Sequence, residues 1–213
     1  MSGAGIEASE LRARLLRACT QVLAARQRLS ALDGAAGDGD LGESLAIGFG
    51  AIERALGEAP SEVDIGELLT LTGRTLSAAA PSTFGTLLGL AWRDAGRALA
   101  GRSVLDAEDV ARMLEAMAGG VAKRGNVTVG QRTVLDALDA SHRAALGSGV
   151  ATAADALNAA ADGAAEGAAA TAAMRPQVGR AGWIADRAMG HPDAGATAWA
   201  VIAAGIAGRE TEL

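Results

Sequence analysis

The sequence predicts an all-α fold, with eight helices in an antiparallel up-and-down bundle that forms a single domain over residues 1–213. Long segments rich in Ala, Leu, Arg and Glu repeat apolar residues at steps of three and four, which is the period of an amphipathic helix. β-Branched and aromatic residues rarely alternate with polar ones, so strands are not expected. With 213 residues, of which 50% are hydrophobic, the chain is long enough to bury one ordinary core.

Apolar stripes and, for several helices, capping residues support the expected helices. The first carries an apolar stripe that includes Leu11 and Leu15, as in a bundle helix that packs on neighbours. The third, fifth and seventh have plausible starts at Ser61, Asp106 and Thr152. The alanine-rich seventh could be of low complexity, but its polar residues are spaced like one face of a packed helix. In chain order, the eight helices are expected over residues 7–28, 43–56, 62–78, 84–99, 106–124, 132–147, 152–174 and 194–208.

The connections between these helices alternate in character. Those after the second, fourth and sixth helix are short and chemically plain. The others contain richer segments, at residues 32–42, 80–83, 125–131 and 175–193. In an antiparallel bundle with short links every second loop returns to the same end, so these four segments are expected to meet at one rim. The alternative is that chance placed uneven loops in this order.

Three aspartates crowd the first of these segments. Asp33, Asp38 and Asp40 lie among glycines, with no Lys or Arg close by in the sequence. Carboxylates on a loop that glycine allows to fold tightly can converge on Mg²⁺ or Ca²⁺, which take oxygen ligands. The spacing does not fit an EF-hand loop. The alternative interpretation is a turn followed by a helix N-cap at Asp40, because Asp-Gly pairs are common in turns.

Two further residues of the rim suit an anion. Thr133 stands at a helix start, where its hydroxyl and the free amides can meet a phosphate, or it simply caps the helix. Arg180 offers a planar donor fork, or it pairs with Asp186 or Asp193. The chain has no Walker A sequence, no dinucleotide fingerprint and no G-x-S-x-G, and neither histidine has a nucleophile at motif spacing. A nucleotide site here must therefore follow another design.

Composition excludes several classes of partner and site. The net charge of -6 and a pI near 5.0 leave no basic stripe, so nucleic acid is not an expected partner. The single cysteine excludes a disulfide within the chain and a zinc site built on several thiolates. The first residues lack the regions of a signal peptide, and the longest hydrophobic stretch, at 193–209, is too short to span a membrane. A cytoplasmic protein is expected.

Read in order, the rim segments resemble the L subunit of the dihydroxyacetone kinase family, the partner that holds the nucleotide. The strongest element is Leu32-Asp33 followed by Gly37-Asp38-Gly39-Asp40, which is similar to the aspartate motif for two magnesium ions in that family. The remaining elements, which extend the resemblance over nearly the whole chain, are Gly85-Thr86, Arg124-Gly125, Val129-Gly130 with Thr133 and Leu135-Asp136-Ala137-Leu138, Gly179-Arg180-Ala181, Gly190-His191 and Asp193.

The resemblance implies an eight-helix antiparallel barrel with ADP or ATP at one end. Asp33, Asp38 and Asp40 would hold two Mg²⁺ that bridge the phosphates, and Arg180 would be the catalytic residue that closes over the nucleotide and neutralises the transferred phosphoryl group. The residues implied to contact the nucleotide, besides Arg180, are Leu41, Gly42, Glu43, Ser44, Ser82, Thr83, Gly125, Thr133, Val134, Asp193, Ala194 and Gly195.

The implied activity is phosphoryl transfer to a small ketose held on a separate K subunit. The phosphoryl donor is ATP or a phosphotransferase-system protein, and neither this choice nor a homodimer is decided by the resemblance. A non-catalytic Mg-nucleotide or regulatory module of the same fold is the alternative. A purely structural bundle would leave the aspartates as turn residues.

Several positions depart from the family pattern. Leu41 stands where the family usually has His, and Gln131-Arg132 replaces the usual Asp-Lys. Ala194 replaces a proline, and the segment 77–81 carries side chains where a glycine- and serine-rich phosphate loop is usual. The expected metal ligands are kept while the expected nucleotide contacts differ, which is typical of a divergent branch.

Overall fold

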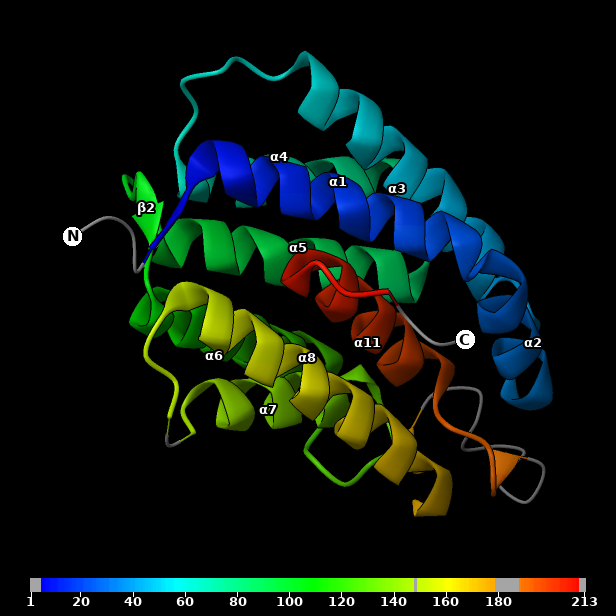
Figure 1. Cartoon of the computed structure of the whole chain (residues 1–213). Coiled ribbons are helices and arrows are strands. Elements are labelled where there is room, and N and C mark those ends of the chain that lie inside the picture. Colours follow the sequence, from blue (N-terminus) through cyan, green and yellow to red (C-terminus); the bar gives the residue numbers. More distant parts are fainter. Residues whose placement is uncertain (1–4, 148, 179–187, 211–213) are drawn as a thin grey trace.

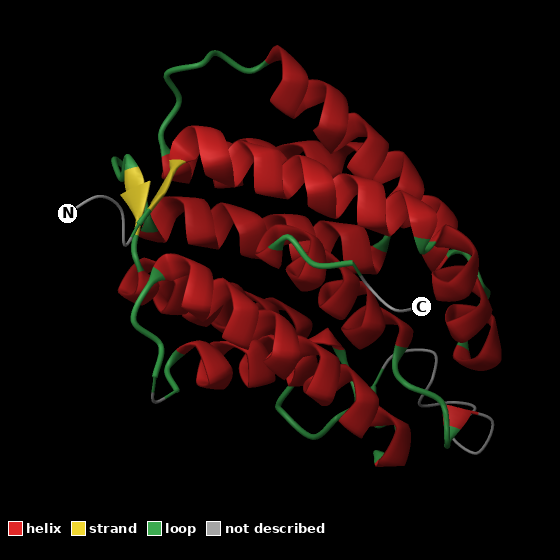
Figure 2. Ribbon diagram, viewed as in Figure 1, coloured by secondary structure: helices red, strands yellow, loops and turns green. Residues whose placement is uncertain are grey.

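The computed structural model describes residues 5–147, 149–178 and 188–210. In this part of the chain, α-helices lie side by side around a common interior, so the predicted all-α class is confirmed (Figure 1, Figure 2). None of these helices is long and apolar enough to cross a membrane. In chain order the elements are β1 (Ile6–Glu7), α1 (Ala8–Ala24), α2 (Arg26–Ala36), α3 (Leu41–Glu58), α4 (Ile65–Ala79), α5 (Thr83–Ala98), β2 (Val104–Leu105), α6 (Ala107–Gly125), α7 (Val134–Ala145), α8 (Ala153–Ala170), the 3-10 turn η1 (Thr171–Ala173) and α11 (Ala194–Ala207).

The helices form a closed ring. From α3 onward, each helix packs on the next one along the chain through α4, α5, α6, α7 and α8 to α11. Helix α1 packs against both α11 and α3, which closes the barrel (Figure 1). Helix α2 lies beyond the end of α1 and packs on α3 and α11. The up-and-down barrel with consecutive helices as neighbours is therefore confirmed.

The first expected helix, over residues 7–28, is wrong in its extent. A turn at Ala25 separates α1 from α2, although the helical hydrogen bonds from Ala25 N to Gln21 O and from Leu29 N to Ala25 O are both 2.9 Å. A second helix then continues to Ala36, because Gly34 is tolerated inside a helix and the alanines and leucines around it favour one. Asp33 consequently lies on the last turns of α2 and not in a loop.

A short pair of strands joins the start of the chain to the connection between α5 and α6. Ile6 lies opposite Leu105 and Glu7 opposite Val104 in antiparallel register. The sequence predicts no strand here, because two residues are too few for an alternating pattern to be recognised. The pairing forms where the two segments meet, and it buries Ile6 and Leu105.

The interior of the barrel is centred on two tryptophans. Trp92 of α5 and Trp199 of α11 are buried with their ring centroids 6.0 Å apart and the rings tilted by 55°. Trp199 Nε1 donates to Ser141 Oγ at 2.8 Å, and that hydroxyl donates to Ala137 O at 2.9 Å. The core therefore connects α5, α7 and α11, three helices that begin at the same end of the barrel.

The two ends of the barrel differ. We call the end formed by residues 37–44, 80–86, 125–136 and 188–196 the mouth, because α3, α5, α7 and α11 all begin there. We call the opposite end the base, where α4, α6 and α8 begin and where β1 pairs with β2. The expected meeting of alternate connections is confirmed for the described residues by contacts across the mouth. Ser44 bonds Ser82, Arg132 bonds the carbonyl oxygens of Ala188 and His191, and Gly195 packs on Phe84.

Candidate functional site

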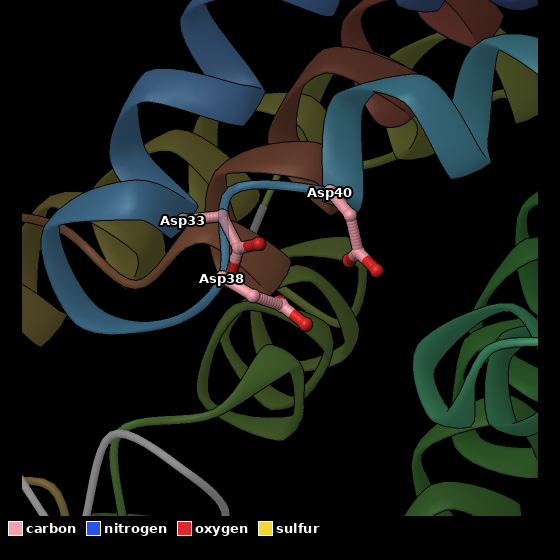
Figure 3. A group of neighbouring side chains, drawn as sticks. All are labelled: Asp33, Asp38 and Asp40. Atoms are coloured by element: carbon pink, nitrogen blue, oxygen red, sulfur yellow. The ribbon is translucent and has the colours of Figure 1, made fainter.

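The structure brings the three predicted aspartates together. Asp33 projects from α2, and Asp38 and Asp40 lie on the connection that leads into α3 (Figure 3). One carboxylate oxygen of each lies within 4.8 Å of one from each of the others. Three carboxylates that converge in this way form an oxygen donor set suited to a hard cation such as Mg²⁺. The donor chemistry therefore fits the predicted metal, and binding itself stays a prediction.

Two glycines make this convergence possible. Gly39 has a φ of 79°, in the left-handed region that glycine adopts readily and most other residues do not. A Cβ atom placed on Gly39 would lie 3.5 Å from Gly34 Cα, so the connection folds back closely onto α2. The interval between Asp38 and Asp40 is thus a tight turn whose geometry depends on Gly39.

The alternative interpretation of Asp40 as an N-cap is wrong. Asp40 precedes α3, but its side chain accepts no hydrogen bond from that helix, and its φ and ψ of -94° and -7° are not those of an extended capping residue. Asp33 Oδ2 instead accepts from Leu41 N at 3.2 Å. The first amide of α3 therefore orients Asp33, and Asp40 is left to face the other two carboxylates.

Hydroxyl groups from two helix starts meet beside the aspartates. Ser44 Oγ donates to Ser82 Oγ at 3.1 Å, and Ser82 Oγ accepts from Gly85 N at 3.1 Å, as the N-cap of α5. Thr83 is exposed in the first turn of α5. The beginnings of α3 and α5 consequently place small polar groups and amide donors side by side, which is the arrangement that binds anions at helix N-termini.

Other predicted contacts in α3 are engaged within the protein. Glu43 pairs with Arg26 Nε at 2.6 Å, so its side chain points to α2. A contact of Glu43 with a nucleotide would therefore use its backbone N–H. A Cβ atom at Gly42 would overlap the carbonyl oxygen of Arg26, so this glycine allows α3 to pack closely on α2. Leu41 is buried, with an exposed fraction of 8%.

The start of α7 is a capping box. Thr133 Oγ1 accepts from Leu135 N at 3.2 Å, and Asp136 Oδ2 accepts from Thr133 N at 2.7 Å. The capping role that the sequence allowed for Thr133 is thus confirmed. Val134, the first residue of α7, is buried, and Gly125 ends α6 next to Val127.

The start of α11 holds the remaining predicted contacts of the described chain. Asp193 Oδ2 accepts from Ala196 N at 2.8 Å, and Asp193 N donates to Thr171 Oγ1 at 2.7 Å. Burial raises the pKa of Asp193 to about 6, against the opposing effect of its bond to Ala196 N and of the Arg132 charge. Ala194 and Gly195 are buried in the first turn, and Gly195 lies against the ring of Phe84 with no room for a side chain.

Arg180, the predicted catalytic residue, lies outside the described residues, as does Asp186. Neither its predicted phosphate contact nor its alternative pairing with Asp186 is therefore described. The sequence does not indicate Arg132 as a site residue. In the structure Arg132 is buried at the mouth, between the starts of α7 and α11. The motif T-x-x-D at residues 133–136 was a sequence signal for the buried role of Asp136. No pattern in the sequence indicated that Arg132 points inward.

A surface groove of the described residues lies away from this site. It has a volume of about 590 Å³ and lies at the base, between the end of α3 and helices α4 and α5. Glu58, Thr70, Arg74 and Arg97 are among the residues that line it, and none of the predicted site residues does.

Comparison with known proteins gives a family match over most of the chain. The family model described as the DAK2 domain matches residues 35–208. The match begins just after Asp33. The ADP-binding subunit DhaL of PEP-dependent dihydroxyacetone kinase 1 from Listeria innocua is 29% identical over 181 residues, covering 83% of this chain and 84% of the relative. D-erythrulose kinase from Mycolicibacterium smegmatis is 34% identical over 220 residues, covering 95% of this chain and 36% of the relative.

A solved structure has the same fold. The crystal structure of the dihydroxyacetone kinase from C. freundii in complex with AMP-PNP and Mg²⁺ superimposes with a TM-score of 0.71 at 25% identity. The match covers 93% of this chain and 33% of that chain. The chain thus spans about a third of the length of this enzyme and of the erythrulose kinase, and nearly the whole length of the DhaL subunit.

Proposed function

The chain belongs to the DAK2 domain family, and on that premise we propose that it is the Mg²⁺- and ADP- or ATP-binding L subunit of a dihydroxyacetone-type ketose kinase. In this proposal it transfers a phosphoryl group to a small ketose that a separate K subunit holds. Its relatives include an ADP-binding DhaL subunit and an erythrulose kinase, which supports the reaction class.

The convergence of Asp33, Asp38 and Asp40 at the mouth is the observation that carries the proposal. These carboxylates would hold two Mg²⁺, whose chemistry is to neutralise the charge of a polyphosphate. The four helices that begin at the mouth add the positive ends of their dipoles to the same region, which favours the phosphates further.

The residues of this chain would bind and orient the donor. The phosphates would lie against Ser44, Ser82 and Thr83, and the base and sugar between the end of α6 at Gly125 and the start of α7. The turn 193–195 would close one side. Arg180 would neutralise charge on the phosphoryl group during transfer, a role that rests on its place in the family motif.

Two titrations test the donor side. Isothermal titration calorimetry with Mg·ADP and with Mg·ATP is expected to show binding that is lost when EDTA replaces Mg²⁺. Heat that does not depend on Mg²⁺, or no heat at all, would refute the role of the aspartate cluster. Addition of a K subunit of a dihydroxyacetone kinase is then expected to give phosphorylation of dihydroxyacetone or erythrulose, with ATP or with a phosphotransferase-system protein as donor.

A non-catalytic Mg-nucleotide module is the second candidate, and one observation favours it. Helix α4 continues to Ala79, so the connection to α5 is short and carries Ala80 and Pro81 in place of a glycine-rich phosphate loop. Binding of Mg·ADP without turnover on any small ketose, in the presence of a K subunit, would support this candidate over the kinase.

A further inference from the structure

Arg132 combines three features that are unfavourable for folding. Its backbone has a φ of 62°, in the left-handed region, where residues other than glycine are strained. Its side chain is buried, with an exposed fraction of 3%, and a buried guanidinium is costly unless it is well paired. Among the described residues, Nε and Nη1 have no hydrogen-bond partner. Such a combination persists where the position serves a site.

The left-handed backbone turns the side chain of Arg132 toward the last part of the chain. Nη2 donates to Ala188 O at 2.9 Å and to His191 O at 2.8 Å. A single nitrogen thus joins two carbonyl oxygens that lie just before α11. Gly190, between them, has a φ of 83° and donates to Ala172 O at 3.0 Å, so this segment is a tight turn held from two sides.

The other side of Arg132 is held firmly. Asp136 is buried and accepts from Gly130 N and from Thr133 N, the latter at 2.7 Å, so the residues on both sides of Arg132 are bound by the first turn of α7. Arg132 therefore connects a rigid helix start to the turn that leads into Asp193. The positive charge of Arg132 lowers the pKa of Asp193, while Asp136 raises it.

We propose that Arg132 is a positioning residue of the nucleotide site, which holds the 193–195 turn at a fixed distance from Thr133 and Val134 at the start of α7. This inference rests on the proposed function, because those two segments are the walls between which the nucleotide would lie. Arg132 does not have to touch the nucleotide to act in this way. Burial of Arg132 costs folding free energy. In return, the two segments that would hold the nucleotide keep their spacing before it binds, so less free energy is needed to order the site.

Replacement of Arg132 by methionine tests the proposal. Arg132→Met keeps most of the buried volume and removes both bonds to the 188–191 turn. Calorimetry with Mg·ADP is expected to show affinity at least about ten-fold weaker than that of the wild type, a loss that corresponds to about 1.4 kcal/mol. Arg132→Lys is expected to bind within about three-fold of the wild type, because one ammonium nitrogen can donate to both carbonyls that Nη2 now bonds.

Controls separate positioning from a general effect on the fold. Arg143→Met removes an exposed arginine of α7, the helix that follows Arg132, and this arginine pairs with Asp139 at 2.8 Å. It is expected to leave Mg·ADP affinity unchanged. Circular dichroism and the binding stoichiometry report the folded fraction of each variant. If Arg132→Met does not fold, Arg132→Gln, which is too short to reach both carbonyls, replaces it with the same expectation.

The outcomes are distinct. Equal Mg·ADP affinity for wild type and Arg132→Met, or a lysine variant that binds no better than the methionine variant, would overturn this inference alone. A wild-type protein that binds no Mg·ADP would overturn the proposed function and this inference with it. A lower melting temperature with unchanged affinity would assign Arg132 a purely structural role.

Discussion

At the base of the barrel, Asp64 and Asp106 precede α4 and α6, and each accepts a hydrogen bond from an amide three residues further along. At the mouth, Asp40 stands in the same relation to α3, yet its side chain forms no such bond. The residue type and its place before a helix are the same at both ends. The difference lies in whether the surrounding chain supplies a donor to the carboxylate.

The two ends also differ in whether arginines pair with their acidic side chains. At the base, Asp109 is fully buried and is paired with Arg102 Nη2 at 2.6 Å and with Arg112 Nη1 at 3.2 Å. At the mouth, no arginine or lysine of the described residues forms an ion pair with Asp33 or Asp40. Among the described residues, Asp109 at the base is thus neutralised by arginines of the chain, whereas Asp33 and Asp40 at the mouth are not, which agrees with the Mg²⁺ proposed there.

Loss of one carboxylate at the mouth should have the largest effect. We expect Asp38→Ala to weaken Mg·ADP binding by more than about 100-fold, since even the loss of a residue that only supports a metal ligand costs about 10- to 100-fold. The helical fold should be kept without Mg²⁺, because this connection lies outside the core. Calorimetry and thermal unfolding measure the two effects. Unchanged Mg·ADP affinity would contradict metal binding by the aspartates at the mouth.

The corresponding change at the base should act on stability alone. Asp109→Ala removes a buried carboxylate that accepts from Arg102 and from Asp106 N, and we expect the free energy of unfolding to fall by about 2 kcal/mol. Urea unfolding measures this loss. Mg·ADP affinity of the folded variant should match that of the wild type, and a large change in affinity would contradict the separate roles of the two ends.

Asp193, which caps α11 at the mouth, should make stability depend on pH. Its pKa in the folded protein is raised from 3.8 to about 6, so between these values the folded protein holds a proton that the unfolded chain has released. Its contribution to stability therefore falls as the pH rises through this window. Relative to the wild type, Asp193→Asn, which still caps α11, should gain at least about 1 kcal/mol between about pH 4 and about pH 7.

The difference between the two proteins is the quantity to measure, because every other titrating group is common to both and cancels. Urea unfolding at a series of pH values gives it directly. A difference that stays constant with pH would show that burial does not perturb this carboxyl group.

The smallest effect is expected at Glu43, which is the matched control for Asp38. Glu43→Gln removes one acidic charge close to the cluster but breaks only a surface pair with Arg26, in which each side chain is 52% exposed. We expect a change in unfolding free energy below about 1 kcal/mol. Mg·ADP affinity should stay within about two-fold, a change of about 0.4 kcal/mol. A loss as large as that of Asp38→Ala would mean that total negative charge, and not the cluster geometry, governs binding.

Much of the mouth could be predicted because its signals are local. The interval between Asp38 and Asp40 contains the glycine that the turn requires, and alternate connections of an up-and-down bundle must return to one end. The sequence predicts a loop at Asp33 because glycines surround the aspartates, whereas in the structure the helical residues around Asp33 extend α2 to Ala36. The side chain of Glu43 could not be assigned from the sequence, since its partner Arg26 lies on another helix.

The amino-acid sequence by itself determined the helical class, the order of the helices and the identity of the acidic triad, because periodicity, caps and turns act over a few residues. Only the tertiary structure decided which carboxylates find donors. Asp40 lacks a capping bond, Asp109 has two arginines, and Arg132 points inward to the 188–191 turn. These outcomes depend on groups far apart in the chain, whose distance is set by how the helices close into a barrel.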